Sequence, residues 1–219
     1  MLSWSSGKDS AWVLHTLRQD PKVEVVGLIT TFNESADRVA MHAVRRELVQ
    51  SQALATGLPL FPVDLPWPCP NDAYEQAMRG SLESVHEDVA FDALAFGDLH
   101  LEDIRDYRER QMLGWGFELL FPIWKRDTTE LSRAMISGGI KAILTCVDPQ
   151  QCPAELVGRH FDHSLLADLP ETADPCGENG EFHTFVYAAP VFATPVSVTL
   201  GEVVERDGFV FADVLPNNS

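Results

Sequence analysis

Short apolar runs alternate with amphipathic helical patterns through the first half of the chain, and this alternation constrains the fold more than any other feature. The apolar runs predict strands at residues 2–4, 23–31, 60–63, 93–96 and, more weakly, 119–121. Helical patterns fill the intervals at residues 9–18, 38–56, 72–87 and 102–115. Because such alternation requires right-handed crossovers, we expect an α/β fold with a parallel sheet covered on both faces. Ligands of such sheets bind beyond the carboxyl ends of the strands.

The helix predicted at residues 38–56 has the clearest pattern of the four. Ala40, Val44 and Leu48 recur at four-residue spacing, so they would share one buried face. Gly57 and Pro59 follow directly and are typical stop signals. We therefore expect this helix to end at Thr56.

The pattern changes after Pro122, where a helix at residues 128–137 precedes an apolar run at 142–147. A loop region rich in Pro, Gly and Asp follows. The chain then shows alternating strands at residues 196–200 and 209–214, with Asp207-Gly208 as a hairpin turn. These features predict a second, smaller α+β domain, so that residues 1–122 form the first domain and residues 123–219 the second.

The formal net charge of −17 bears on the class of partner. Nucleic-acid-binding proteins carry a basic footprint, and here the local basic candidates are Arg105, Arg108 and Arg110, so we expect no nucleic-acid partner. No apolar run approaches the roughly 20 residues that span a bilayer, and no basic region precedes an apolar stretch at the N-terminus. The cysteines show no paired spacing: Cys69, Cys146, Cys152 and Cys176. Together these observations predict a reduced, cytoplasmic protein without a membrane partner.

A cluster of Ser and Gly residues joins the first apolar run to the first helix. Backbone N–H groups and the helix dipole make such a turn an anion site. Its side chains add hydroxyl donors and one positive charge, and the segment comprises Ser5, Ser6, Gly7, Lys8, Asp9 and Ser10. It is not a Walker A loop, because Asp follows the lysine where that motif has Ser or Thr. The alternative is an ordinary serine-rich helix cap.

A second polar loop spans residues 174–184 and contains Asp174, Glu178, Glu181 and His183. Carboxylates and an imidazole in proximity suit general acid–base work or Mg²⁺ ligation. Two glycines in this loop allow the backbone turns that would orient these side chains. The alternative is a polar, solvated hairpin loop.

Further candidates follow individual predicted strands. Asn33 and Glu34 end the second strand, where adenine or ribose contacts occur, although a plain loop cap explains them equally well. His42, expected on the next helix, is a candidate for nucleotide contact or an ordinary surface or core histidine. Asp98 follows the fourth strand and is the preferred Mg²⁺ ligand. Glu102 and Asp103 fall in a first helical turn, where carboxylates stabilise the helix without any further function.

These segments occur in one order that resembles the diphthine–ammonia ligase family, also described as N-type PP-loop ATP pyrophosphatases. The resemblance covers nearly the whole chain and is carried by residues 5–10, Gly97 to Arg105, Phe121-Pro122 with Trp124, and Cys176 to Thr184. It implies a PP-loop domain, of the adenine nucleotide alpha hydrolase-like type, followed by a smaller α+β domain. Ser6 stands where the PP-loop pattern Ser-Gly-Gly-x-Asp-Ser usually has its first glycine. The resemblance also places Gly97 beside the nucleotide.

The family activity uses ATP and ammonium to convert a carboxylate on a modified histidine of an elongation factor into an amide. The resemblance therefore implies ATP and Mg²⁺ as cofactors and a carboxylate-bearing substrate, such as a modified protein side chain. In a bacterial source the family activity would lack this substrate. A homodimer is one possible assembly state.

We therefore predict an ATP-dependent amide ligase that forms an acyl-adenylate, releases pyrophosphate and transfers ammonia. The catalytic candidates are Glu178, Glu181 and His183, and the nucleotide candidates are residues 5–10, Asn33, His42 and Gly97. One alternative is a protein of the same fold that binds or hydrolyses adenine nucleotides without ligase activity. Another is a PP-loop enzyme that modifies tRNA, but this would require a basic face and a persulfide-competent cysteine pair.

Overall fold

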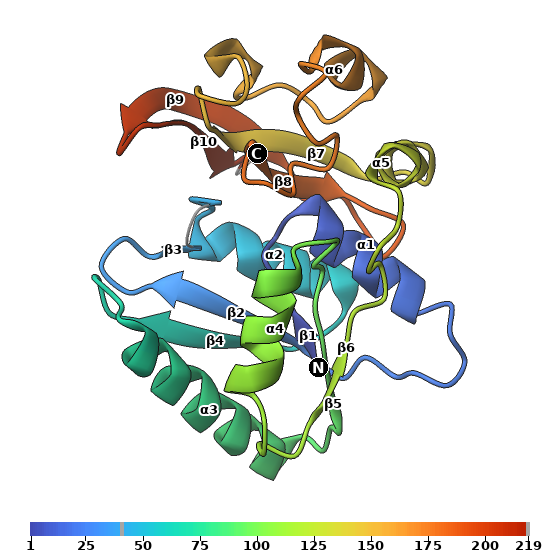
Figure 1. The fold of residues 1–219 in the computed structure, drawn as a ribbon, viewed down its shortest axis with the longest axis vertical. Coiled ribbons are helices and arrows are strands. Elements are labelled where there is room, and N and C mark those ends of the chain that lie inside the picture. Colours follow the sequence, from blue (N-terminus) through green and yellow to red (C-terminus); the bar gives the residue numbers. More distant parts are fainter. Residues whose placement is uncertain (40–41, 218–219) are drawn as a thin grey trace.

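The computed structural model describes residues 1–39 and 42–217 of the chain, and Figure 1 shows its two sheets. The first sheet is mostly parallel. Its parallel strands are β1 (Leu2–Ser3), β2 (Leu28–Asn33), β4 (Leu60–Leu65), β5 (Ala93–Ala95) and β6 (Glu118–Leu120). They lie in the order β4-β2-β1-β5-β6, with β4 paired along the whole of β2. Because β1 is central, the chain that leaves its carboxyl end lies in the middle of the sheet edge where ligands bind.

Helices cover both faces of this sheet. Figure 1 shows α1 (Lys8–Leu17) and α2 (Arg46–Thr56) between the two sheets, and α3 (Asn71–Asp88) on the opposite side. Alternate residues of a strand point to opposite faces, so Leu28 joins the core cluster between the sheets while Ile29 joins the cluster beneath α3. The helix α4 (Glu102–Gln111) follows β5 and has no fully buried residue.

The second sheet is antiparallel and lies on α1 and α2. Its strands are β7 (Lys141–Val147), β8 (Phe182–Ala188), β9 (Val198–Arg206) and β10 (Phe209–Pro216), in the order β8-β7-β10-β9. The helix α5 (Thr128–Ser137) precedes it, and a 3-10 turn (Ala154–Leu156) and α6 (His163–Asp168) follow β7. The predicted hairpin turn joins β9 to β10, where Asp207 and Gly208 both have positive φ. The predicted fold class is confirmed: an α/β part is followed by a smaller α+β part.

The helix predicted at residues 38–56 is shorter than expected. It begins at Arg46, and Arg38–Val39 form a short strand, β3, antiparallel to the end of β2. The N–H of Val39 bonds to the carbonyl of Val44, and Ala43 has a φ of 53°, which no helix interior adopts. Tertiary pairing thus outweighs the helical spacing, and Ala40 lies outside the described residues. Gly57 ends the helix in the left-handed conformation, as predicted.

Other boundaries also differ from the predictions. Strand β2 begins at Leu28 rather than at residue 23, and α4 ends at Gln111 rather than at residue 115. The strand predicted at 196–200 runs from Val198 to Arg206. The loop predicted to extend to residue 184 ends at Phe182, where β8 pairs with β7. That pairing was not foreseen, since the polar residues at 178–184 mask the pattern of the strand.

Candidate functional site

A pocket of 280 Å³ lies beyond the carboxyl ends of β1 and β5, against β8 of the second sheet. Nine of the predicted site residues line it: Ser5, Lys8, Asp9, Ser10, His42, Gly97, Asp98, Glu178 and His183. Four others do not: Ser6, Gly7, Asn33 and Glu181. The two polar segments that lie about 170 residues apart in the sequence therefore form one site, and fold topology accounts for its position.

The first wall of the pocket is the turn at the start of α1. The N–H of Lys8 donates to Thr184 Oγ1 (3.1 Å), and the Ser10 hydroxyl donates to the carbonyl of Gly7 (3.0 Å). A Cβ at Gly7 would lie 2.9 Å from His42 Cε1 and 3.3 Å from the carbonyl oxygen of Thr184, so a side chain there would displace the His42 imidazole. Similarly, a Cβ at Gly97 would lie 3.3 Å from the backbone of Asp9. These glycines set the distance between the walls.

Ser6 has a φ of 70°, the conformation that the glycine of the related pattern adopts without strain. The residue is completely buried, and its hydroxyl has no hydrogen-bond partner among the described residues. Both features cost free energy, because a left-handed conformation is unfavourable for a residue with a Cβ and a buried hydroxyl without a partner is desolvated.

We expect Ser6→Gly to raise the free energy of unfolding by about 1 kcal/mol, because relief of backbone strain and of the buried hydroxyl outweighs the larger entropy loss of glycine. Chemical denaturation of both proteins measures this difference. Ser6→Ala separates the two contributions, since it removes the hydroxyl but keeps the Cβ. A Ser6→Gly protein less stable than the wild type would contradict the prediction.

Lys8 is 2% exposed, and its ammonium is already engaged within the protein. It donates to the Asp9 carboxylate (2.9 Å and 3.1 Å) and to the carbonyl of Cys176. Burial alone would lower the pKa of Lys8, but Asp9, together with Cys176 and Glu178, more than offsets this, so the pKa is raised and the ammonium stays charged. Lys8 therefore ties the start of α1 to the loop that precedes β8.

Gln52, on α2, is a residue that the sequence did not reveal. It is completely buried, and its amide donates to the carbonyls of Ser6 (3.0 Å) and Val186 (2.6 Å) and accepts from Trp4 Nε1 (2.8 Å). It thus joins the residue after β1, the turn before α1 and strand β8. A glutamine on a helix gives no sequence signal for this role, because its partners are distant along the chain.

The second wall is the loop that precedes β8. Glu178 Oε1 accepts from the backbone N–H groups of Leu99 (2.8 Å) and His100 (3.2 Å), which links this loop to the segment after β5. Burial raises the pKa of Glu178, and these two bonds only partly offset the effect. Glu181 is 1% exposed and accepts from the N–H groups of Asp174 and Asn179, so its carboxylate shapes the loop from within.

His42 and His183 form a pair of imidazoles with ring centroids 4.7 Å apart. His42 lies in the turn before α2, not on the helix as predicted, and His183 lies on β8. His42 Nδ1 is 3.1 Å from the carbonyl of Thr184, which can only accept, so Nδ1 carries the proton and Nε2 a lone pair. Burial lowers the pKa of both, that of His183 well below its usual value, with His42 and Lys8 adding to the effect. Both rings are therefore neutral at pH 7.

The lowered pKa of His183 predicts a pH-dependent stability. Below about pH 6.5 the unfolded chain binds a proton at this residue but the native state does not, so stability falls as pH falls. One such group contributes at most about 1.4 kcal/mol per pH unit. We expect denaturation between pH 7.5 and 5.5 to show a smaller loss in His183→Asn than in the wild type. An equal loss of stability with falling pH in both proteins would contradict this prediction. Glu178, whose raised pKa acts in the opposite direction, is present in both and does not affect the comparison.

Asp98 lies at the pocket in a two-point ion pair with Arg108 (2.8 Å and 3.2 Å). The Arg108 guanidinium carbon is 4.5 Å from the centroid of the Phe96 ring. In the sequence Arg108 stands out only as one of three clustered arginines, so its place in the pocket is a result of the tertiary structure. The ion pair thus places a guanidinium group and a carboxylate side by side in the lining of the pocket.

Three other candidates lie elsewhere. The Asn33 side chain accepts from the N–H groups of Ser35 and Ala36, which is the loop cap considered as the alternative. Glu102 pairs with Lys125 on the surface, and Asp103 is exposed in the first turn of α4. All three fit local stabilising roles.

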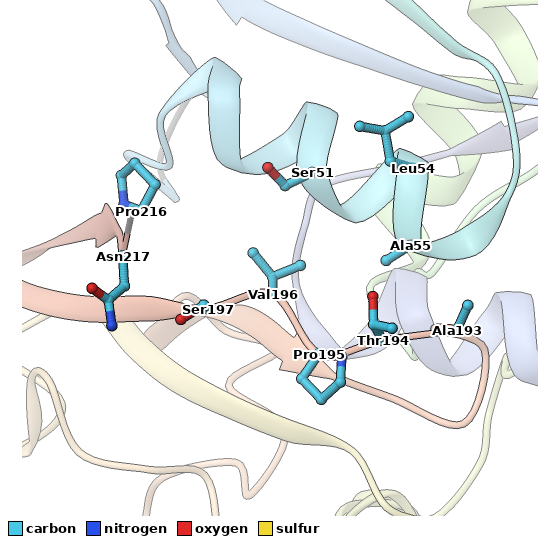
Figure 2. A pocket seen from close by; sticks show the side chains of 10 residues that line it. All are labelled: Ser51, Leu54, Ala55, Ala193, Thr194, Pro195, Val196, Ser197, Pro216 and Asn217. Carbon is cyan, nitrogen blue, oxygen red and sulfur yellow. The ribbon is translucent and has the colours of Figure 1, made fainter. Parts of the chain in front are cut away.

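A larger hollow of 360 Å³ lies between α2 and the segment that follows β8 (Figure 2). Its ten lining residues include no titratable side chain: Ser51, Leu54, Ala55, Ala193, Thr194, Pro195, Val196, Ser197, Pro216 and Asn217. Since acid–base and phosphate chemistry need charged or titratable groups, the smaller pocket is the candidate site.

Comparison with known proteins shows the family of this chain. The Diphthamide synthase N-terminal domain model matches residues 1–116, and the Diphthamide synthase C-terminal domain model matches residues 127–211. The chain belongs to the diphthamide synthase family. From the first match the pocket of this family member takes Ser5, Lys8, Asp9, Ser10, Gly97 and Asp98, and from the second it takes Glu178 and His183.

Individual relatives carry the name diphthine–ammonia ligase. The zebrafish protein is 26% identical over 238 residues, which covers 96% of this chain and 90% of the relative. The rat and human proteins are 30% and 29% identical over 97 residues, which covers 42% of this chain and 36% of each relative. Those shorter alignments thus span about a third of the relatives' length. No helix in the described part of this diphthamide synthase family member has the length and apolar character to cross a membrane.

Proposed function

We propose that the chain is an ATP-dependent amide ligase that activates a carboxylate as its adenylate and transfers ammonia to it. The observation that carries this proposal is one pocket in which a Ser- and Gly-rich turn at a helix N-terminus, a structure suited to binding anions, faces two neutral imidazoles and the carboxylate of Glu178. Relatives named diphthine–ammonia ligase support diphthine as the carboxylate substrate. ATP and ammonium are the other substrates.

The turn at residues 5–10 binds the phosphates in this proposal. Backbone N–H groups at the start of α1 and the hydroxyl of Ser5 supply the donors, and the Ser10 hydroxyl joins them by exchanging its bond to the Gly7 carbonyl for one to phosphate. The substrate carboxylate attacks the α-phosphorus, and pyrophosphate leaves toward this turn. Because Lys8 is held by Asp9 and Cys176, its charge contributes through the local potential rather than as a mobile ligand. Positioning and charge stabilisation supply most of the catalysis.

Mg²⁺ fits this pocket as a companion of the nucleotide. The described residues contain no cluster of three or more His, Cys, Asp or Glu that could hold a metal alone. Mg²⁺ usually binds one or two carboxylates together with substrate phosphates, and Asp98 lies on the pocket wall, where its carboxylate has lone pairs beyond the two that accept from Arg108. When bound, the metal would neutralise phosphate charge, and Asp98 is the residue that would hold it.

The second half of the reaction requires proton acceptors. Ammonia attacks the carbonyl carbon of the adenylate, AMP leaves, and the nitrogen loses a proton as the amide forms. The imidazole of His183 is neutral and lines the pocket, so it can accept that proton. Glu178 orients the segment that carries Asp98 through its bonds to Leu99 and His100. Glu181 shapes the same loop from inside.

Product analysis tests this proposal. Incubation with ATP, Mg²⁺, ammonium and a diphthine-bearing acceptor should yield AMP and pyrophosphate, with amide in equal amount. ADP and phosphate as main products would exclude the mechanism. AMP release that never depends on ammonium would favour the alternative of a nucleotide hydrolase.

Added tRNA tests the alternative of a PP-loop enzyme that modifies tRNA. With a net charge of −17, we expect tRNA neither to bind at physiological salt nor to stimulate turnover. Cytoplasmic location and a homodimer are part of the same proposal, and sedimentation analysis of the purified protein tests the second.

A further inference from the structure

Asp213 lies on β10 of the second sheet. Its carboxylate accepts hydrogen bonds from two arginines in the first half of the chain. Arg38 Nη1 donates at 2.8 Å, and Arg45 donates through Nε (3.2 Å) and Nη2 (2.6 Å). The Asp213 side chain is 22% exposed, so the interaction is partly shielded from water. Such two-point contacts with a carboxylate fix orientation as well as distance.

A β-bulge lies opposite Asp213. Ala212 pairs with Val203 and Val214 pairs with Leu200, so two residues of β9 face the single residue Asp213 of β10. Bulges redirect the side chains near them. The irregular pairing therefore gives Asp213 an orientation that a regular strand would not provide.

The two arginines lie at the ends of the segment that carries His42. Arg38 and Arg45 form an isolated β-bridge, and Arg38 Nη1 also donates to the carbonyl of Ala43 (2.7 Å). Val39 and Val44 are joined by a backbone hydrogen bond (2.9 Å) within this segment. The ends of the segment are thus held together, and Asp213 joins both of them to β10.

His42 is the residue of this segment that lines the nucleotide pocket, against Thr184 and His183 of β8. β8 and β10 belong to the same sheet. The bonds of Asp213 and the contacts of His42 therefore both fix the segment from Arg38 to Arg45 against the second sheet. The other groups that act on His42 are Lys8 and Asp9 of α1.

We propose that Asp213 is a positioning residue for the nucleotide pocket, which holds the His42 imidazole in place by binding Arg38 and Arg45 together. This inference rests on the proposed function for the identity of the ligand, ATP. It assigns a role in nucleotide binding to a side chain that lies outside the pocket lining and on a different strand.

The test compares ATP binding by calorimetry in the wild type, Asp213→Asn, His42→Ala and the double variant. In the wild-type background we expect Asp213→Asn to weaken ATP binding about 5–10-fold. In the His42→Ala background the same substitution should weaken ATP binding less than about twofold. Arg45→Gln should reproduce the effect of Asp213→Asn. The matched control is Asp64→Asn, which removes one of the two carboxylate partners of Arg46 at the start of the same helix and should leave ATP affinity unchanged.

A second readout does not depend on ATP. NMR titration of His42 should show its pKa, lowered by burial in the wild type, moving toward the usual value in Asp213→Asn. If the wild type bound no ATP, the proposed function would fail. The NMR titration would still show whether Asp213 positions His42. An unchanged His42 titration, or an equal effect of Asp213→Asn with and without His42, would overturn the inference.

Discussion

Replacing Gln52 by leucine is expected to lower the free energy of unfolding by about 3 kcal/mol, although the two side chains are similar in size. The variant leaves the Trp4 indole N–H buried without a partner and removes a donor from the carbonyls of Ser6 and Val186. Each buried group without a partner costs about 1–3 kcal/mol. The Ser6 carbonyl keeps one bond, from the N–H of Val186, which limits the total.

The same variant should weaken ATP binding, because Gln52 is bonded to the turn that would bind the phosphates. Denaturant unfolding and calorimetry on one preparation measure both effects. Gln50→Leu is the matched control, since Gln50 is exposed on the same helix, and its effect should stay within about 0.5 kcal/mol. A loss in Gln52→Leu no larger than in Gln50→Leu would show that the buried network does not stabilise the fold.

Glu178→Gln and His183→Asn are expected to reduce turnover by roughly 10²-fold while ATP affinity changes only several-fold, the usual pattern when an acid–base or orienting group is lost. Glutamine keeps a carbonyl oxygen for the N–H groups of Leu99 and His100 and loses only the charge. Asparagine likewise keeps a polar side chain on β8. Neither change touches the turn at residues 5–10.

Initial rates of AMP formation and calorimetric ATP affinities separate these effects. Glu171→Gln and His163→Asn are matched controls, because both residues are exposed and lie away from the pocket. Full turnover in both pocket variants would show that the loop before β8 serves only the architecture. A loss of ATP affinity as large as the loss of turnover would instead place these side chains on the nucleotide.

Local sequence information was sufficient for the elements whose residues carry their own signal. The spacing of apolar residues predicted the parallel strands and α5, and Gly57 and Asp207-Gly208 predicted a helix end and a hairpin turn. The Ser and Gly cluster predicted the turn at residues 5–10 for the same reason, since turn residues and free N–H groups are local properties.

Boundaries that depend on pairing were less predictable. Residues 38–39 have helical spacing toward α2 but form β3, because β2 offers unpaired groups at its end. The sequence predicts a loop where β8 lies, because the polar residues around its start hide the strand pattern, and only pairing with β7 forms the strand. Propensity is a weak prior where a neighbouring strand supplies hydrogen bonds.

The sequence by itself determined that this chain folds around a parallel sheet with a Ser- and Gly-rich turn after the first strand, and that a second polar loop follows. Only the tertiary structure decided that His42 meets His183, that Arg108 joins Asp98, and that Gln52 connects the turn to β8. The physical reason is the range of the interactions. Periodicity and turn chemistry act between residues a few positions apart, whereas a buried hydrogen bond between Gln52 and Val186 depends on the packing of two sheets against α2.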